Sequence, residues 1–518
     1  MNKFMRPWIK RLAGMVLCMP LLAGCASPTA KRQAGLNHFF DFDNRPSRIA
    51  MDVFGNFDVY IAQFDPAPRL AEVSRLPVTR LHLRCSQEED LSAVQDMPLR
   101  ELVLEYCGGI HTLPAFRHAR LHAIHIEGTP IRCLDPIKEQ PLRSISLIHT
   151  DVSSIEALRG MSLTNFVFWG REPDLDIGPL AGMPLRSIRL HSGKYGNMDA
   201  LRGAPLRDVF VSPSGPEDLS FLAESPVNRL YVNLGRLKDL NALSPLPLTW
   251  LRLYATRTED LSALKGKQLR FLHLHRLPVN DLSPLKGMPL DELYLLDIKA
   301  SDLTPLRGML LTTLSLHSKD VNSLDPLAGM PLERLAIPSC SKIDDLSPLK
   351  GMFLKELNLA HTAVTDLSPL KGMPIEDFCI TGTSVTDLSP LKGMPLRAFR
   401  AANTPVEDIS ALAGMKLNLL DLQMCENIRD LSPLKGMPLE ELRFSPRHIT
   451  NGIEIIRNMP ALEVINGVDA ESFFRDYDDG FRGDFIRPEG AGGTAHCSGS
   501  NDTPTTAGES GARLLPGQ

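Results

Sequence analysis

The chain carries a recurring pattern in which pairs of leucines alternate with polar residues. One copy places leucines at 354, 357 and 359, followed by Thr362 and Val364. Because alternate residues of a strand face opposite sides, Leu357 and Leu359 are expected to share one face. The alternation is too short for an independently stable strand, so the pattern predicts short strands that pair with their neighbours.

A second block, Ser-Pro-Leu-Lys-Gly, separates these predicted strands. In the copy at 283–287, Ser283 can cap a short helix, Pro284 suits its first position and Gly287 can end it in a left-handed conformation. Five residues allow about one turn, which favours a 3₁₀ helix. Each unit is therefore predicted to have a strand on one side and a tight helical turn on the other.

The two blocks together repeat every 21 or 22 residues. The segment DLSPLKGMPL begins at Asp281, Asp387 and Asp430, and the same step leads back to Arg69 through eighteen units in all, with a degenerate unit near Ile453. With strands roughly 4.8 Å apart, the sheet would extend on the order of 90 Å. Stacked units share a continuous core, so residues 69–465 are predicted to form one solenoid rather than several domains.

This motif resembles the leucine-rich repeat, and its length is closest to the short units of internalin-like bacterial proteins. The resemblance covers about residues 69–465. It implies an α/β solenoid: a curved stack with a parallel β-sheet on the concave face and short 3₁₀ turns on the convex face. The chain departs from the family at the ninth motif position, where Asn is usual and where it has mostly Thr (Thr362) or Cys (Cys340). A hydroxyl can supply part of the backbone bonding of Asn, so the ladder is expected to persist.

The N-terminus has the pattern of an export signal. Four positive charges precede an apolar run from Leu12 to Leu22, which is too short to span a bilayer as a stable helix. The run ends in Leu-Ala-Gly-Cys25, which resembles a bacterial lipobox and implies cleavage before Cys25 and lipidation of its sulfur. The absence of Asp after Cys25 favours, by analogy with Gram-negative sorting, the outer membrane of the bacterial envelope. The alternative is an ordinary signal peptide with an incidental cysteine.

The segments outside the repeats are predicted to have separate roles. Residues 1–24 are the signal peptide, 25–48 a lipidated tether and 49–68 an N-terminal cap over the open edge of the solenoid. Residues 466–487, with Phe473, Phe474 and Tyr477, are expected to form a C-terminal cap, and 488–518 a disordered tail because they have almost no bulky side chains.

Composition and charge narrow the classes of function. Hydrophobic residues make up 43 % of the 518 positions and aromatic residues only 6 %, so leucine supplies the core volume. The formal charge of −5, which would become about −9 without the signal peptide, accompanies no visible basic tract, so nucleic acid is not an expected partner. No phosphate-binding loop, H-E-x-x-H or G-x-S-x-G motif occurs, so neither catalysis nor a cofactor is predicted.

The strand positions between the leucines should face the concave surface, and in the middle units they are rich in aromatic side chains, His and Arg. The candidate partner-binding residues are Trp169, Arg189, His191, Phe210, Tyr231, Trp250, Arg252, Tyr254, Phe271, His273, His275, Tyr294 and His317. Leucines already fill the core, and Trp, Tyr and Arg dominate binding hot spots. We therefore predict a recognition surface for a protein, peptide or glycan. Alternatively, the rings simply suit strands and the protein is a passive envelope scaffold or spacer without a ligand.

Three smaller patterns have mainly structural interpretations. His273 and His275, with Asp297 in the next unit, could approach a metal, but two histidines without a clear carboxylate partner are weak evidence, and no metal is predicted. The Asp that starts each unit is expected to accept backbone N–H bonds, with the Lys or Arg of each L-K-G block offsetting its charge. Cys85 and Cys107 lie in adjacent units and could form a disulfide in an oxidising envelope.

Overall fold

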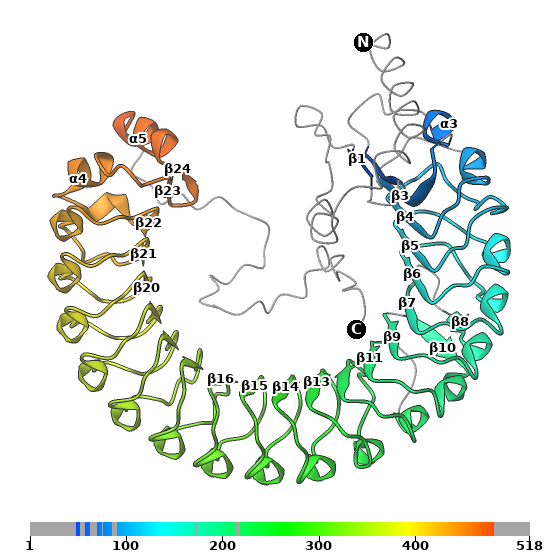
Figure 1. Ribbon diagram of the computed structural model, residues 1–518. Coiled ribbons are helices and arrows are strands. Elements are labelled where there is room, and N and C mark those ends of the chain that lie inside the picture. Colours follow the sequence, from blue (N-terminus) through cyan, green and yellow to red (C-terminus); the bar gives the residue numbers. More distant parts are fainter. Residues whose placement is uncertain are drawn as a thin grey trace, which may run out of the picture. The chain divides into compact units, whose positions relative to one another are not determined.

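The computed structural model describes residues 48–51, 57–62, 70–74, 76–84, 91–170, 174–191, 193–212 and 218–480. These residues belong to two compact units. Unit 1 contains the described residues up to 248 together with 254–256, and unit 2 contains 249–253 and the described residues from 257 onward. In each unit taken by itself, strands follow the inner side of a curve and tight helical turns follow its outer side (Figure 1).

Unit 1 is a ladder of short strands joined by 3₁₀ turns. Its strands are β1 (Arg48–Met51), β2 (Phe57–Ala62), β3 (Val78–Arg84), β4 (Glu101–Glu105), β5 (Ala123–Glu127), β6 (Ser144–Ile148), β7 (Asn165–Trp169), β9 (Ser187–Leu190), β11 (Asp208–Val211) and β12 (Arg229–Val232), with β8 (Asp174–Asp176) and β10 (Lys194–Gly196) as a separate parallel pair. Its helical turns are α3 (Leu70–Val73), η2 (Ser92–Val94), η3 (Asp135–Ile137), η4 (Glu156–Leu158), η5 (Gly178–Leu180), η6 (Met198–Leu201), η7 (Ser220–Leu222) and η8 (Asn241–Leu243). From β2 to β12, each strand of the main ladder pairs in parallel with the next.

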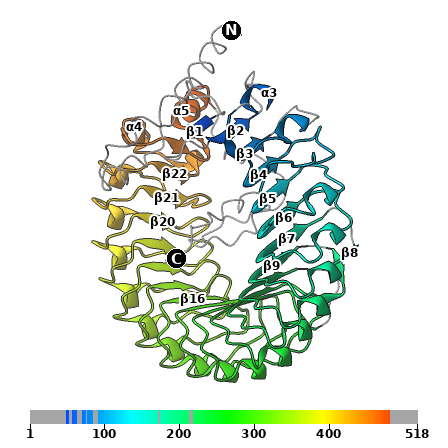
Figure 2. The same ribbon diagram turned by 45° about the vertical axis from the view of Figure 1, so that its right-hand side comes forward.

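Unit 2 continues the same repeat. Its strands are β13 (Trp250–Tyr254, whose last residue falls in unit 1), β14 (Phe271–His275), β15 (Glu292–Leu296), β16 (Thr313–His317), β17 (Arg334–Ala336), β18 (Glu356–Asn358), β19 (Asp377–Cys379), β20 (Ala398–Arg400), β21 (Leu419–Leu422), β22 (Glu441–Phe444), β23 (Val464–Ile465) and β24 (Val468–Asp469). Its turns are η9 (Ser262–Leu264), η10 (Ser283–Leu285), η11 (Thr304–Leu306), η12 (Asp325–Leu327), η13 (Ser347–Leu349), η14 (Ser368–Leu370), η15 (Ser389–Leu391), η16 (Ser410–Leu412), η17 (Ser432–Leu434) and η18 (Pro446–His448), followed by α4 (Ile453–Arg457) and α5 (Ala470–Asp478). The turned view in Figure 2 shows the succession of strands and turns along this unit.

The leucines of each repeat form the core, as the alternation predicts. In β15, Leu293 and Leu295 are fully buried, while Glu292, Tyr294 and Leu296 are half-buried on the opposite face of the sheet. We call that opposite face, on the inner side of the curve, the concave face. Removing each leucine pair from water provides the main favourable free energy of the stack.

The helical turns differ from the expected capping arrangement in one respect. Ser283 begins the 3₁₀ turn but makes no side-chain capping bond; instead, the Oδ1 atom of Asp281 accepts the Ser283 N–H at 2.8 Å. The same bond occurs at other unit starts, such as Asp366 with Ser368 at 2.8 Å. The Asp column is therefore structural, as predicted. Its carboxylates, rather than the predicted Ser side chains, accept the N–H bond at the start of the turn. Gly287 ends the turn with a φ of 74°, also as predicted.

The ninth-position side chains bond the backbone in two ways. The Thr362 hydroxyl donates to the Leu359 carbonyl of its own turn at 2.7 Å, and Thr404 does the same to Ala401 at 2.7 Å. The Cys425 thiol instead reaches the Ala401 carbonyl of the preceding repeat at 3.0 Å. The expectation that a hydroxyl replaces part of the Asn bonding is confirmed at Thr362 and Thr404. At two other ninth positions among the described residues, Thr150 and Thr256, the buried hydroxyl has no hydrogen-bond partner.

Hairpins close both ends of the ladder. At the start, β1 pairs antiparallel with β2, which pairs in parallel with β3, so this hairpin occupies the predicted cap segment. At the end, β23 pairs in parallel with β22 and antiparallel with β24, after which α5 buries Phe473 and Phe474. Each end therefore offers an antiparallel strand where a further repeat would otherwise stack.

Several sequence predictions fall outside the described residues. These are the signal peptide, Cys25, the tether up to residue 47, the last part of the C-terminal cap (481–487), the tail 488–518 and the Cys85 partner of the suggested disulfide. Within the described part, the Cys107 thiol lies 3.5 Å from the Leu83 carbonyl oxygen. No helix in the described ranges combines the length and apolar character needed to cross a bilayer.

Candidate functional site

The concave face of unit 1 carries a continuous stack of aromatic rings. Trp169 at the end of β7 stacks on His191, with ring centroids 4.8 Å apart and planes 10° from parallel. His191 stacks in turn on Phe210 at 4.3 Å, and Phe210 on Tyr231 at 4.1 Å and 3°. His149 closes the Trp169 end with an edge-on contact at 4.4 Å. We call Trp169, His191, Phe210 and Tyr231 the first ladder.

Strand register explains how these rings meet. Phe210 and Tyr231 are direct partners in the β11–β12 pairing, so their side chains project side by side. His191 follows β9 and reaches Phe210 diagonally, because the direct partner of Phe210 on β9 is Arg189. The ladder thus combines in-register and diagonal contacts.

Unit 2 has a second, less regular group of rings on its concave face. Trp250 stacks on Phe271 at 4.7 Å and 7°, and Tyr294 lies 5.5 Å from Phe271 with its plane tilted by 39°. Tyr294 also stacks on His273 at 5.3 Å, and its hydroxyl donates to a Glu292 carboxylate oxygen at 3.0 Å. We call Trp250, Phe271, His273 and Tyr294 the second ladder.

The aromatic rings of the predicted recognition surface lie outside the leucine core. Tyr231 and Trp250 are half-buried on the concave face, and so are the remaining predicted site residues except His273. In the first ladder, near-parallel stacking covers the ring faces, so these rings turn their edges toward solvent. A recognition surface therefore presents ring edges rather than open ring faces.

His273 is the exception to the predicted exposure. Its side chain is only 1 % exposed, so a partner could not contact it directly, and its Nε2 atom has no hydrogen-bond partner. Burial lowers the pKa of His273 from 6.5 to about 3, with a smaller contribution from Arg252. Its neutral ring therefore acts as packing beneath Tyr294 rather than as a contact residue.

His191 in the first ladder is also held neutral. Burial lowers its pKa from 6.5 to about 4, and the nearby positive charge of Arg189 adds to the shift. A neutral imidazole stacks between Trp169 and Phe210 without placing a charge among apolar rings. This shift is not predictable from the sequence, because it depends on contacts between repeats.

Of the two histidines that could approach a metal, only His275 lies beside Asp297, whereas His273 is buried. Asp297 lies 2.7 Å from His317 Nδ1, 3.5 Å from His275 Nε2 and 3.7 Å from Arg276 Nε. Within the described ranges, no group of three or more His, Cys, Asp or Glu side chains has the arrangement of a metal site. His275 and His317 thus lie against Asp297 at the margin of the second ladder, and burial lowers the pKa of His275.

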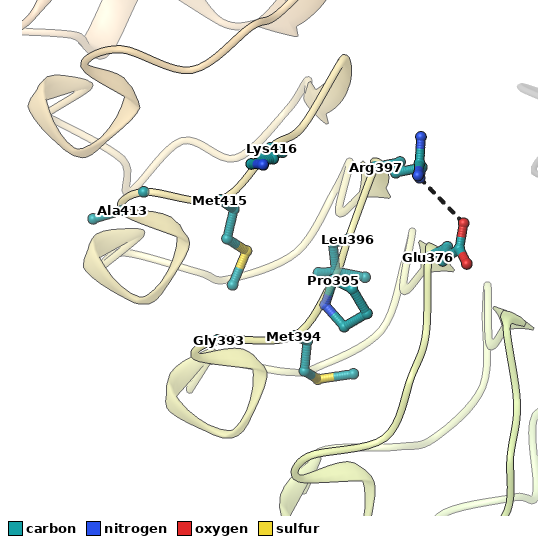
Figure 3. A pocket seen from close by; sticks show the side chains of 10 residues that line it. Glu376, Gly393, Met394, Pro395, Leu396, Arg397, Ala413, Met415 and Lys416 are labelled. Atoms are coloured by element: carbon teal, nitrogen blue, oxygen red, sulfur yellow. Dashed lines mark ion pairs between the residues drawn. The ribbon is translucent and has the colours of Figure 1, made fainter.

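A shallow pocket of unit 2 lies away from the concave face. Met394, Pro395, Leu396 and Met415 line it between two successive repeats (Figure 3). At its rim, Arg397 Nε lies 3.2 Å from a Glu376 carboxylate oxygen. Its lining offers apolar contacts and one satisfied ion pair, with no nucleophile and base placed together.

Comparisons with known proteins identify the fold. No family model and no curated protein matches the chain. Among solved structures, a TLR13–ssRNA13 complex has a TM-score of 0.50 at 15 % identity, covering 77 % of this chain and 71 % of that one. An internalin (inlF) from Listeria monocytogenes has a TM-score of 0.42 at 18 % identity, covering 66 % of this chain and 86 % of that one. The chain has the leucine-rich-repeat solenoid fold, as predicted, and the likeness to the TLR13 structure shows the fold alone.

Proposed function

We propose that this chain is a bacterial envelope protein, anchored by lipid at Cys25, that binds a protein or peptide through the ring edges of its concave face. The observation that carries the binding proposal is the first ladder, in which rings from four successive strands or strand ends form one half-exposed apolar strip. Leucines fill the core of this fold, so the strip is not part of the core that the repeats require.

Ring stacking favours a protein or peptide over a glycan. Sugars bind aromatic residues by lying on an open ring face, whereas Phe210 has His191 on one face and Tyr231 on the other. Ring edges suit apolar side chains and backbone carbonyl oxygens, because the quadrupole of a ring makes its edge positive. Arg189, which is half-buried beside the ladder, adds a donor for carbonyl or carboxylate groups.

The lipid anchor and the outer-membrane location rest on the sequence of residues 1–27. The basic start, the short apolar run and Cys25 after Ala-Gly support them. Mass spectrometry of the protein purified from bacterial membranes tests the anchor directly. A mature N-terminus at Cys25 carrying acyl chains is expected, and cleavage elsewhere or an unmodified Cys25 would contradict it.

The binding proposal is tested with peptide and glycan arrays probed by the full chain. The variant Phe210→Ser/Tyr231→Ser should lose peptide binding, because it opens the first ladder. Phe353→Ser is a matched control, since Phe353 is 79 % exposed and is not a concave-face residue of its repeat. Equal loss in both variants, or binding to glycans only, would argue against the proposal. Binding to neither array would favour the passive scaffold.

A further inference from the structure

The residue that precedes each strand forms a second row, distinct from the concave face. In unit 1, backbone N–H groups at this position donate to the backbone carbonyl oxygen at the same position of the preceding repeat, at 2.8 or 2.9 Å. The pairs are Arg143 to His122, Thr164 to Arg143, Arg186 to Thr164 and Arg207 to Arg186. The His122 N–H likewise donates to Arg100 at 2.8 Å. These residues are therefore consecutive rungs of a hydrogen-bonded ladder. We call Arg100, His122, Arg143, Thr164, Arg186 and Arg207 the flank row.

The flank row contains four arginines and no carboxylate. With rungs about 4.8 Å apart, its ends are separated by about 24 Å. All four arginine side chains are exposed, and none has an ion pair within the described part of the chain. The acidic residues that directly follow the row in the sequence form ion pairs with other arginines: Glu101 lies 3.1 Å from Arg80, and Asp208 lies 4.0 Å from Arg189.

Unit 2 provides an internal comparison at the same repeat position. There, opposite charges occupy neighbouring rungs and form ion pairs: Arg270 with Asp291 at 3.4 Å, Lys355 with Glu333 at 2.8 Å and Arg397 with Glu376 at 3.2 Å. Figure 3 shows the last of these pairs. The repeat geometry thus allows ion pairs between neighbouring rungs at this position. Unit 1 instead places side chains of like charge along the row, where they repel one another.

The side chains of the flank row match phosphate groups. Guanidinium presents paired donors that fit phosphate oxygens, and arginine rather than lysine occupies every cationic rung apart from His122. Two residues before the arginines lie the exposed prolines Pro98, Pro141, Pro184 and Pro205. Single-stranded nucleic acid is bound through aromatic side chains on which bases stack, and these positions hold none. An exposed row of guanidinium groups flanked by small rigid residues fits an anionic surface better.

We propose that the flank of the repeats at the strand starts docks on an anionic phospholipid surface through the arginines of the flank row. This goes beyond the concave-face function and is independent of the lipid on Cys25. The members of this row are 21 or 22 residues apart in the chain, so they do not form a basic tract in the sequence. A protein docked by its flank would keep the concave face open to a partner.

The test is sedimentation of the full chain with vesicles of phosphatidylcholine alone or with added phosphatidylglycerol. The variant Arg143→Gln/Arg186→Gln/Arg207→Gln removes three charges from the flank row. The matched control, Arg270→Gln/Lys355→Gln/Arg397→Gln, removes three charges from ion pairs at the same repeat position in unit 2. Any binding through the N-terminal segment is common to all three proteins.

The wild type should bind the phosphatidylglycerol vesicles preferentially. At low salt, the flank-row variant should bind them about 100-fold more weakly, on the basis of a typical contribution per basic residue near an anionic membrane, and the control should lose much less. Equal loss in the two variants would reduce the effect to net charge and overturn the proposal. Wild-type binding to heparin or single-stranded DNA without binding to vesicles would overturn it too, by assigning the row to a soluble polyanion.

Discussion

Phe210 and Tyr231 stack with ring centroids 4.1 Å apart and planes 3° from parallel, although 21 residues separate them in the chain. Their strands pair in parallel with these two residues directly opposite each other. The stack is thus a contact between two consecutive repeats, made on the side of the sheet that faces away from the core.

The Phe210–Tyr231 contact should contribute measurably to stability. Aromatic pairs of this kind add roughly 0.5–1.5 kcal/mol beyond the area that they bury. A double-mutant cycle with Phe210→Ala and Tyr231→Ala, followed by urea unfolding, should therefore give a coupling free energy within that range. A coupling near zero would mean that the rings are adjacent without stabilising the sheet.

Acid should destabilise the protein through its stacked histidines. The pKa of His191 is lowered to about 4 and that of His273 to about 3, whereas an unfolded histidine titrates near 6.5. Between these values the unfolded chain binds more protons, so stability falls as pH decreases from about 6.5 and this loss ends near the folded pKa values.

The variant His191→Phe isolates this effect from the titration of carboxylates. It keeps a ring between Trp169 and Phe210 but removes one titrating group, so its melting temperature should fall less between pH 7 and pH 4 than that of the wild type. Parallel melting curves for the two proteins across this pH range would contradict the burial of a neutral His191.

Replacing two different glycines by alanine should reduce stability by different amounts. Gly287 has a φ of 74° and nothing within 4 Å of an added Cβ, so Gly287→Ala costs only backbone strain, about 1 kcal/mol. In Gly452→Ala, the added Cβ would lie 2.7 Å from backbone atoms of Leu431 and Ser432, which cannot move easily. Denaturant unfolding should show a clearly larger loss at Gly452. The opposite order would exclude steric contact as the cause.

Cysteine reactivity should follow burial. Cys133 is exposed, whereas Cys340 and Cys425 are buried, and burial raises the pKa of both buried thiols. Because the thiolate is the reactive form, a maleimide should label Cys133 rapidly and spare the other two until the chain unfolds. Rapid labelling of Cys340 in the folded protein, detected by peptide mass spectrometry, would indicate that its repeat opens locally.

Periodicity was sufficient to predict the fold. Leucines at fixed spacing specify a buried face, and Asp281 and Gly287 mark the limits of a turn whose bonds are local. Features that depend on side chains from two repeats were not predictable in the same way. The alternation places His273 on the concave face, but its complete burial depends on how neighbouring rings such as Tyr294 pack over it.

The candidate site was likewise only partly predictable from the repeat pattern. The pattern correctly places Trp169 and Tyr231 on the concave face, but the stacking order depends on the diagonal approach of His191 to Phe210. The flank row was missed because Arg186 and Arg207 look unrelated in a linear reading. The arginine column becomes visible in the sequence only when the repeats are aligned by position.

The hairpins at the two ends give the protein a defined length. A parallel ladder of identical rungs could in principle accept a rung from another molecule, as fibrils do. Here β1 and β24 run against the direction of the ladder, and β24 has only two residues. An incoming repeat would meet a reversed or very short edge, which disfavours growth into filaments.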